Sequence, residues 1–412
     1  MSMELRKDVS YVVRSLIEDN NPYNNVCEAL KKHKFSSGKI YVVAIGKAAY
    51  TMALAAKDTI KNVRKGVVIS KYGHITKKIN GYKCFEAGHP ISDNNTIEAS
   101  KYVLEMTSNL RENDEVILLI SGGGSALFES PKVPLATIQD INDQLLKSGA
   151  KINEINMIRK HLSNVKGGRF AKHCMPAKVT SIILSDVIGD DLSSIASGPA
   201  VPDNSSSEDA LRIINRYRIN VSDEVRDILK EETVKQLDNI ETIVVGSVSK
   251  MCECAKKRLE HIGYETYVIT DSIQEEARVV GASLGHMARK YKDINKSIAF
   301  IIGGETIVRV NGVGKGGRNQ ELALAACKDI SGLDRTCVFA FGSDGTDGPT
   351  DAAGGYVDGD SAKEFEKIGV DVDEFLNNNN AYNCLKQING LIKTGPTGSN
   401  VNDIYCLLIR RN

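Results

Sequence analysis

The stretch Glu115-Val-Ile-Leu-Leu-Ile120, followed at once by Ser121-Gly-Gly-Gly-Ser125, decides the fold of this chain of 412 residues. Residues 116–120 are apolar without alternation, which is typical of a strand buried on both faces of a parallel sheet. A strand that runs into a glycine-rich turn and a helix commonly binds an anion such as phosphate, because small residues let backbone N–H groups approach it. A plain tight turn explains one such loop equally well. We expect phosphate binding at Ser121, Gly122, Gly123, Gly124 and Ser125.

The same pattern of apolar strand, small-residue turn and helix recurs along the chain. Ile40–Ile45 leads into Gly46-Lys47-Ala48-Ala49, and Val179–Leu184 leads into Ser185-Asp186. Alternation of strands and helices predicts parallel sheets, and the length of the chain predicts two domains. We therefore predict an α/β fold of two α/β/α (Rossmann-like) domains with mostly parallel sheets, divided into residues 1–236 and 237–412 after a polar, helical region.

Composition excludes several classes of protein. Hydrophobic residues make up 42% and charged residues 25% of the chain, as in soluble globular proteins, and a net charge of +1 argues against general nucleic-acid binding. The sequence shows neither a signal peptide nor a run of apolar residues long enough to span a membrane. Its nine cysteines lack metal-ligand or redox spacing. We expect free thiols in a cytoplasmic protein that binds neither membranes nor nucleic acids.

Two groups of basic residues are candidates for binding an anion. Lys47 is expected at a helix start, where backbone N–H groups and the helix dipole favour negative charge. A phosphate site explains a lysine at that position, and so does a solvated surface lysine. Arg159 and Lys166 belong to a second, dense group of positive charges that either attracts a small anion or forms a solvated basic face.

A second glycine-rich loop precedes a predicted helix near residue 321. Gly312, Gly314 and Gly317 match the pattern Gly-x-Gly-x-x-Gly, so a dinucleotide site stays open as an alternative. Lys315 and Arg318 favour highly charged phosphates instead, since arginine can offer a rigid pair of donors to a phosphoryl group. We expect nucleotide phosphates at Gly314, Lys315 and Gly317.

Carboxylates occupy two of the predicted turns. Asp186 follows a predicted strand, and Asp344, Asp347 and Asp351 share the turn-rich run 343–355. Magnesium typically takes one or two carboxylates together with phosphate oxygens. We expect Asp186, Asp344 and Asp347 to be metal ligands, although turn chemistry explains at least one carboxylate of the run.

Several ordered motifs in the chain resemble the class II glycerate kinases. In the N-terminal half these are Gly46-Lys-Ala-Ala49, Ala87-Gly-His-Pro90, Ser121-Gly-Gly-Gly-Ser125, Arg159-Lys-His-Leu-Ser163 and Lys166-Gly-Gly-Arg169. In the C-terminal half, Gly316-Gly-Arg-Asn-Gln-Glu321 and Ser343-Asp-Gly-Thr-Asp-Gly-Pro349 resemble the MOFRL domain of that family. The resemblance extends over nearly the whole chain.

The resemblance implies ATP-dependent phosphorylation of D-glycerate, giving 2-phospho-D-glycerate, in a cleft between two domains. It implies Lys47 and Arg318 as the catalytic pair. ATP and Mg²⁺ or another divalent cation are then the expected cofactors, and Arg159 and Lys166 are expected to bind the glycerate carboxylate. We expect a monomer or homodimer. The alternatives are an NAD(P)H-dependent hydroxypyruvate reductase and a nucleotide-binding regulator without turnover.

Overall fold

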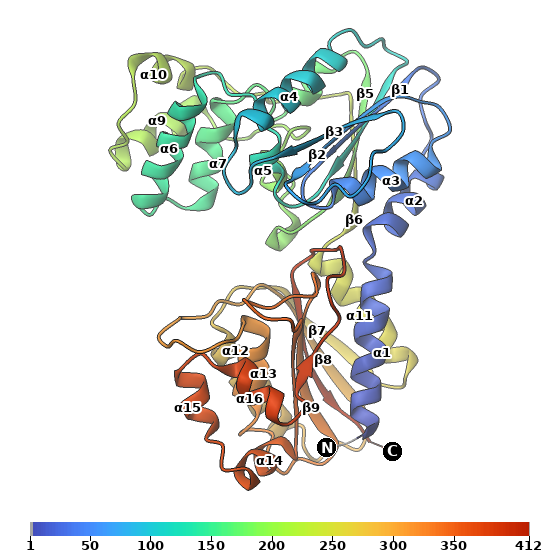
Figure 1. Ribbon diagram of the computed structural model, residues 1–412, viewed down its shortest axis with the longest axis vertical. Coiled ribbons are helices and arrows are strands. Elements are labelled where there is room, and N and C mark those ends of the chain that lie inside the picture. Colours follow the sequence, from blue (N-terminus) through green and yellow to red (C-terminus); the bar gives the residue numbers. More distant parts are fainter. Residues whose placement is uncertain (1–2, 412) are drawn as a thin grey trace. The chain divides into compact units, whose positions relative to one another are not determined.

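The computed structural model describes residues 3–411, which form two compact units (Figure 1). The first unit contains residues 22–245, and the second joins residues 3–21 to residues 246–411. This division differs from the predicted ranges 1–236 and 237–412, because the first helix packs with the C-terminal part of the chain and because the strand after residue 239 belongs to the first sheet. Among the described residues, no helix combines the length and apolar character that crossing a membrane requires.

The first unit is built on a six-stranded sheet whose order is β3-β2-β1-β4-β5-β6. Its strands are β1 (Ile40–Ile45), β2 (Val63–Lys71), β3 (Tyr82–Ala87), β4 (Glu115–Ile120), β5 (Lys178–Leu184) and β6 (Ile240–Gly246). From β3 to β5 all neighbouring strands are parallel, and every residue of β4 is buried, which confirms the predicted buried strand. The strand order reverses between β1 and β4, and in such folds ligands bind at this switch point, beyond the carboxyl ends of the strands.

The helices of the first unit cover this sheet and form a separate cluster. They are α2 (Pro22–Lys32), α3 (Ala49–Thr59), α4 (Asn94–Met106), α5 (Gly124–Leu127), α6 (Leu135–Lys147), α7 (Ile152–His161), α8 (Arg169–His173), α9 (Ser207–Arg216) and α10 (Asp223–Leu229). Helix α3 packs on β1 and β2, and α4 packs on β2 and β3. Helices α6, α7, α9 and α10 share an apolar core of their own, which includes Ile141, Ile155 and Ile214 (Figure 1).

The second unit contains a six-stranded sheet of order β11-β10-β9-β12-β8-β7. Its strands are β7 (Glu265–Ile273), β8 (Ile298–Gly304), β9 (Thr336–Gly342), β10 (Gly354–Asp358), β11 (Leu391–Ile392) and β12 (Asp403–Ile409). The prediction of a mostly parallel sheet is wrong for this unit: β7 and β8 are parallel, and the other neighbours are antiparallel. The last strand, β12, inserts between β8 and β9 in the opposite direction, a long-range pairing that local sequence patterns do not specify.

Helices cover both faces of the second sheet. They are α1 (Met3–Asp19), α11 (Val248–His261), α12 (Ala277–Lys290), α13 (Arg318–Ala326), α14 (Ser361–Lys367), α15 (Val372–Asn377) and α16 (Ala381–Gln387). Figure 1 shows α1 and α11 on one face, and α12, α13 and α16 on the other. The buried strands between them give the second unit three layers, as predicted.

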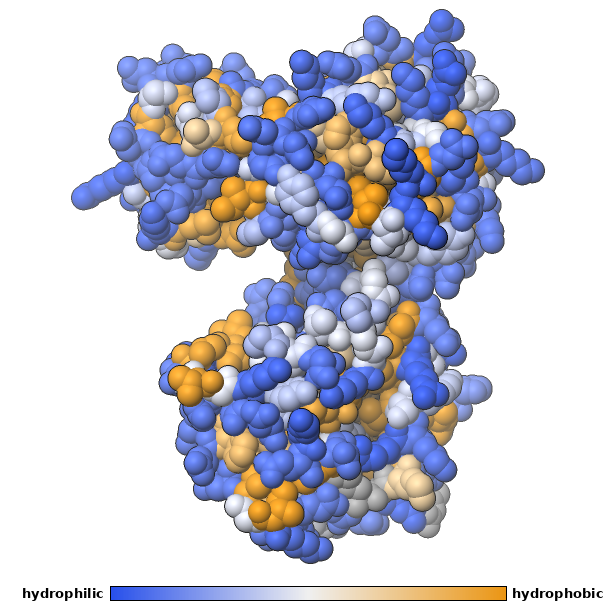
Figure 2. Space-filling model, viewed as in Figure 1, coloured by the Kyte–Doolittle hydropathy of each residue, from blue (hydrophilic) through white to orange (hydrophobic). Residues whose placement is uncertain are grey.

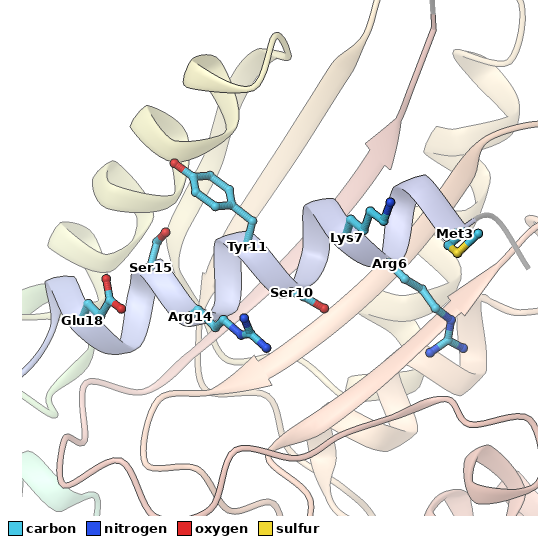
Figure 3. Close-up of a pocket in the computed structure, with 8 residues that line it drawn as sticks. All are labelled: Met3, Arg6, Lys7, Ser10, Tyr11, Arg14, Ser15 and Glu18. Carbon is cyan, nitrogen blue, oxygen red and sulfur yellow. The ribbon is translucent and has the colours of Figure 1, made fainter.

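Helix α1 is fixed to the second unit by apolar packing and by Asp8. The Asp8 carboxylate accepts hydrogen bonds from the Tyr264 hydroxyl and from Arg410 Nη1, each at 2.7 Å. The Arg6 guanidinium lies 4.5 Å from the centre of the Tyr356 ring. Figure 3 shows Arg6 and Arg14 on one side of the helix and Tyr11 on the other, around a shallow hollow of about 610 Å³ that is lined by residues of α1 alone.

The packing of α1 predicts a localised loss of stability in Leu16→Ala. Leu16 is buried, and truncating a buried leucine costs about 2–5 kcal/mol. Amide hydrogen exchange in the variant should accelerate in α11 and β9, which contact α1, and stay unchanged in β4 of the first unit. Ser10→Ala, at an exposed position of the same helix, is the control. Faster exchange in β4, with α11 and β9 unaffected, would contradict the assignment of α1 to the second unit.

Candidate functional site

In the first unit, the loops after β1 and β4 are bound to each other at the switch point of the sheet. Ile45 and Ile120 are neighbours at the ends of these strands. The backbone N–H of Lys47 donates to the Gly122 carbonyl at 2.9 Å, and the Ser121 hydroxyl accepts a hydrogen bond from the Ala48 N–H at 3.0 Å. Lys47 therefore lies beside the glycine-rich loop. Lys47 is partly exposed, so its ammonium group can meet an anion.

Asp186 and His89 meet the glycine-rich loop from two further strand ends. A Cβ added at Gly122 would lie 2.0 Å from Asp186 Oδ2, and one added at Gly123 would lie 3.0 Å from His89 Nε2 and 3.4 Å from Lys47 Cγ. Gly123 also has a φ of +87°, which favours glycine. Burial, Lys47 and other nearby basic groups lower the pKa of His89, so its ring is neutral at pH 7. The structure thus gathers an ammonium, a carboxylate and a neutral imidazole around one loop.

The other side of this loop faces a strained turn. Ala196, Ser197 and Gly198 all have positive φ values, of 51°, 59° and 64°. Ser197 Oγ hydrogen-bonds to Ser125 Oγ at 3.0 Å. Non-glycine residues in this conformation cost free energy and cluster at functional sites. Ser125 is accordingly held by a neighbour that the sequence did not single out.

In the second unit, Arg318 is held by two carboxylates. Its Nε and Nη2 donate to the buried Asp403 at 2.5 and 3.3 Å, and its Nη1 donates to Glu305 at 2.6 Å. Asp403 reaches Arg318 because the start of β12 lies opposite the ends of β8 and β9. Burial opposes the charge of Arg318, but Asp403 and Glu305 outweigh that effect and raise its pKa. Neither carboxylate was singled out from the sequence, because their contact with Arg318 depends on how β12 pairs.

Arg318 and Glu305 line a cavity of about 840 Å³. Its polar lining includes Asp344 and Thr346, and its apolar lining includes Ile307, Val308, Val310 and Pro349. Figure 2 shows apolar side chains scattered over a mainly hydrophilic surface, and at this cavity 53% of Ile307 and 75% of Val310 are exposed. A cavity with a guanidinium and an apolar wall suits a ligand that has both an anionic and an apolar part.

The glycine-rich loop before α13 uses its N–H groups within the protein. The Asn379 side chain accepts hydrogen bonds from the N–H groups of residues 311 and 312, and the Gly314 N–H donates to the Asn378 carbonyl at 2.9 Å. The Lys315 N–H donates to Asn380 at 3.1 Å. The N–H groups of Gly314 and Lys315 are therefore bound by the protein itself, and phosphate binding at these residues stays a prediction. The loop therefore offers a ligand the charge of the exposed Lys315, and the guanidinium of Arg318 follows it in the sequence.

The three carboxylates of the run 343–355 have different surroundings. Asp347 is buried and accepts hydrogen bonds from the N–H groups of Asn319 and Gln320, so it caps the start of α13. It also fills the space beside Gly317, where an added Cβ would lie 2.3 Å from its Oδ1. Asp351 pairs with Lys393 at 2.8 Å on the surface. Of the three, Asp344 is the one that combines partial exposure with a place in the cavity.

No group of three or more His, Cys, Asp or Glu side chains within residues 3–411 is arranged to hold a metal ion by itself. Magnesium needs only one or two carboxylates when phosphate oxygens complete its shell. Asp344 fits that requirement, and so does Asp186 in the first unit. Asp347 is less suited, because it is buried and both of its oxygens accept backbone N–H groups.

Lys166 and Arg159 are engaged within the first unit. Lys166 is fully buried, and its ammonium lies 3.0 Å from Glu129 Oε2 and donates to the Phe128 carbonyl at 2.7 Å. Burial lowers the pKa of Lys166, and Glu129 opposes that shift. Arg159 is partly exposed and donates through Nε to Asn142 at 2.9 Å. Lys166 is thus held by interior contacts, whereas Arg159 is partly exposed. That either residue binds the glycerate carboxylate stays a prediction.

Two family models match the chain. One, described as "Domain of unknown function (DUF4147)", matches residues 8–230, and the other, described as "MOFRL family", matches residues 298–403.

Known proteins resemble the chain over almost its full length. D-glycerate 2-kinase of Thermotoga maritima is 48% identical over 98% of each chain, and glycerate 2-kinase of Pyrococcus horikoshii is 42% identical over 99% of this chain and 98% of its own. The crystal structure of glycerate kinase from Thermotoga maritima superposes with a TM-score of 0.95 at 47% sequence identity, covering 99% of this chain and 100% of that one.

The burial of Lys166 predicts that Lys166→Met reduces stability. The substitution leaves the buried Glu129 without its cation, which typically costs about 3–5 kcal/mol of unfolding free energy. Adding Glu129→Leu should restore part of the loss, because it removes the unpaired charge. Denaturant unfolding measures both effects, with the exposed Lys172→Met as control. An unchanged stability of Lys166→Met, together with weaker ligand binding, would contradict the structural role.

The burial of Asp347 predicts a pH dependence of stability. Burial raises its pKa from 3.8 to about 6, so the folded protein binds a proton more tightly than the unfolded chain does. The unfolding free energy should therefore fall as pH rises from about 4 to about 6, by at most about 1.4 kcal/mol per pH unit. Asp347→Asn keeps a hydrogen-bond acceptor but cannot ionise. The difference in stability between wild type and this variant should follow that fall, and a difference independent of pH would contradict it.

Proposed function

The chain belongs to the family of glycerate 2-kinases that carry a MOFRL domain, and we propose that it transfers the γ-phosphoryl group of ATP to D-glycerate. The products are 2-phospho-D-glycerate and ADP. The observation that carries this proposal is the guanidinium of Arg318, fixed by Asp403 at the edge of a cavity large enough for a nucleotide. Phosphoryl transfer depends mainly on positioning and on charge stabilisation, which such a group provides.

Arg318 is suited to stabilise the phosphoryl group during transfer. Asp403 binds two of its nitrogens and fixes the plane of the guanidinium, which leaves Nη1 on the side of Glu305 and the cavity. A guanidinium held in advance stabilises developing negative charge without the cost of reorienting. We assign the anionic end of the cavity to the nucleotide phosphates and the apolar wall of Ile307, Val308 and Val310 to its base.

Lys47 is the second cation of the proposed mechanism. It lies beside the glycine-rich loop Ser121–Ser125 at the switch point of the first sheet, where α/β folds bind ligands. We propose that Lys47 and Arg318 are the catalytic pair that stabilises the transferring phosphoryl group. Arg159, the partly exposed member of the predicted pair, is the proposed contact of the glycerate carboxylate.

Asp344 and Asp186 are the proposed ligands of Mg²⁺. Both carboxylates are partly exposed and follow the end of a strand, close to residues that are expected to bind phosphate. A divalent cation bound at either carboxylate would neutralise phosphate charge and orient the oxygens of the nucleotide. The nine cysteines are free thiols, which is in keeping with a cytoplasmic location.

The second candidate function, an NAD(P)H-dependent reductase, depended on the pattern Gly312-x-Gly314-x-x-Gly317. A dinucleotide pyrophosphate binds to the N–H groups of such a loop and to the start of the following helix. In this chain Asn378–Asn380 bind the loop N–H groups, and Asp347 caps α13. The anion site that the reductase requires is thus filled by the protein itself, which favours the kinase.

One experiment separates these functions. The protein is incubated with Mg-ATP and D-glycerate, and the products are assigned by phosphorus NMR. The proposal expects ADP and a phosphate ester on the 2-hydroxyl. A parallel assay without ATP follows NADH or NADPH oxidation with hydroxypyruvate at 340 nm. Turnover in the second assay and none in the first would overturn the proposal, and turnover in neither would favour a regulator.

The proposed catalytic pair predicts two defective variants. Lys47→Ala and Arg318→Lys should each lower kcat by about 10²–10³, the usual effect of removing one group that stabilises transition-state charge. Lysine keeps the charge at position 318 but loses the two-pronged contact with Asp403.

Matched controls are Lys57→Ala on α3 and Arg289→Lys on α12, both at exposed positions. Steady-state kinetics with thermal melting separates lost chemistry from lost folding. A Lys47→Ala or Arg318→Lys variant that folds normally and keeps most of the wild-type kcat would remove that residue from the mechanism.

A further inference from the structure

The two carboxylates that bind Arg318 differ in burial and in the number of guanidinium nitrogens that they bind. Asp403 has a side-chain exposure of 3%, receives two nitrogens of the guanidinium, and is bound in addition by the Tyr405 hydroxyl at 3.2 Å. Glu305 has a side-chain exposure of 46% and receives Nη1 alone. Asp403 is therefore a permanent part of the protein interior, whereas the Glu305 carboxylate can exchange the guanidinium for water at little cost.

Glu305 binds Nη1, the guanidinium nitrogen that Asp403 does not bind. Asp403 takes Nε and Nη2, so the third nitrogen, Nη1, is the one directed away from that pair. Glu305 and Arg318 both line the cavity of about 840 Å³, so a ligand there approaches the guanidinium past the Glu305 side chain. With both carboxylates in place, the group carries two negative charges against one positive charge. An anionic ligand is repelled by that balance and attracted once Glu305 moves away.

We propose that Glu305 is a positioning residue for Arg318, which binds Nη1 before the nucleotide arrives and gives it up to a phosphate oxygen when the nucleotide binds. This inference rests on the proposed function, because it takes Arg318 as the group that meets the phosphate. The guanidinium keeps its place through Asp403 while one carboxylate is exchanged for another anion. Glu305 thus keeps the donor paired and lowers the affinity for the nucleotide, which assists release of ADP.

Two other roles for Glu305 give different results. If it were a ligand of Mg²⁺, its loss would weaken nucleotide binding, and only in the presence of the cation. If it were needed only for the fold, its loss would lower stability and weaken binding under all conditions. Competition for Nη1 predicts the opposite change in nucleotide affinity, because removing the competing carboxylate strengthens binding.

The test is the affinity for ADP, measured by calorimetry in EDTA, of the wild type, Glu305→Gln and Glu305→Asp. Glutamine removes the charge, whereas aspartate keeps it but is too short to reach a guanidinium that Asp403 holds. Both variants should bind ADP more tightly, Glu305→Gln by about tenfold, which corresponds to about 1.4 kcal/mol. Their thermal stability should equal that of the wild type.

Glu276→Gln is the matched control, because it breaks the ion pair of Glu276 with Arg309, at 3.3 Å, outside the cavity lining. It should leave ADP binding unchanged. Tighter binding by Glu305→Gln alone, with Glu305→Asp equal to wild type, would show a general charge effect and overturn the proposal. Unchanged or weaker binding by both variants would overturn it too.

Arg318→Lys separates this inference from the proposed function. If Arg318→Lys weakens ADP binding while the Glu305 variants do not strengthen it, only the role of Glu305 is overturned. If Arg318→Lys binds ADP as the wild type does, Arg318 does not meet the phosphate, and both proposals fall together.

Discussion

The ion pair of Arg318 with Asp403 is the interaction on which the second unit's site depends. It exists because β12 enters the sheet between β8 and β9 in the opposite direction, so its first residue lies at the edge where those two strands end. A buried carboxylate that binds two nitrogens fixes both the position and the plane of the guanidinium. With the guanidinium placed in this way, its remaining nitrogen, Nη1, contacts Glu305, and both side chains line the cavity.

The first unit also has a cation, Lys47, beside the ends of its strands, but in a different arrangement. Its parallel sheet reverses strand order between β1 and β4, and hydrogen bonds join the loops of Lys47 and Gly122. Strand ends alone bring the charges of Lys47 and Asp186 together there, beside the neutral ring of His89. One unit thus offers a cation held by a buried acid, and the other a cation beside a glycine-rich loop.

The sequence was most informative where the signal is local. The unbroken apolar run of β4 predicted a buried parallel strand, and the small residues after it predicted the loop beside Lys47. It was least informative where contacts join distant segments. The pairing of Asp403 with Arg318 follows from strand order, which no periodicity encodes.

The glycines of the second unit also contact segments far along the chain. Gly314 matches a phosphate-binding pattern, but a Cβ there would lie 2.4 Å from the Asn378 carbonyl oxygen, so close packing against a segment far along the chain explains it. Lys166 belonged to a basic cluster in the sequence, yet the fold buries it against Glu129. In both cases the local sequence marks the residue as unusual, but the partner that explains it lies far along the chain.

The central proposal is that Lys47 and Arg318 both stabilise the transition state of phosphoryl transfer. A double-mutant cycle on kcat with Lys47→Ala and Arg318→Lys tests it most directly, because groups that act as a unit on one transition state show losses that do not add. The account predicts a double variant only slightly slower than the slower single variant. Losses that multiply in full would show two independent effects and contradict the claim.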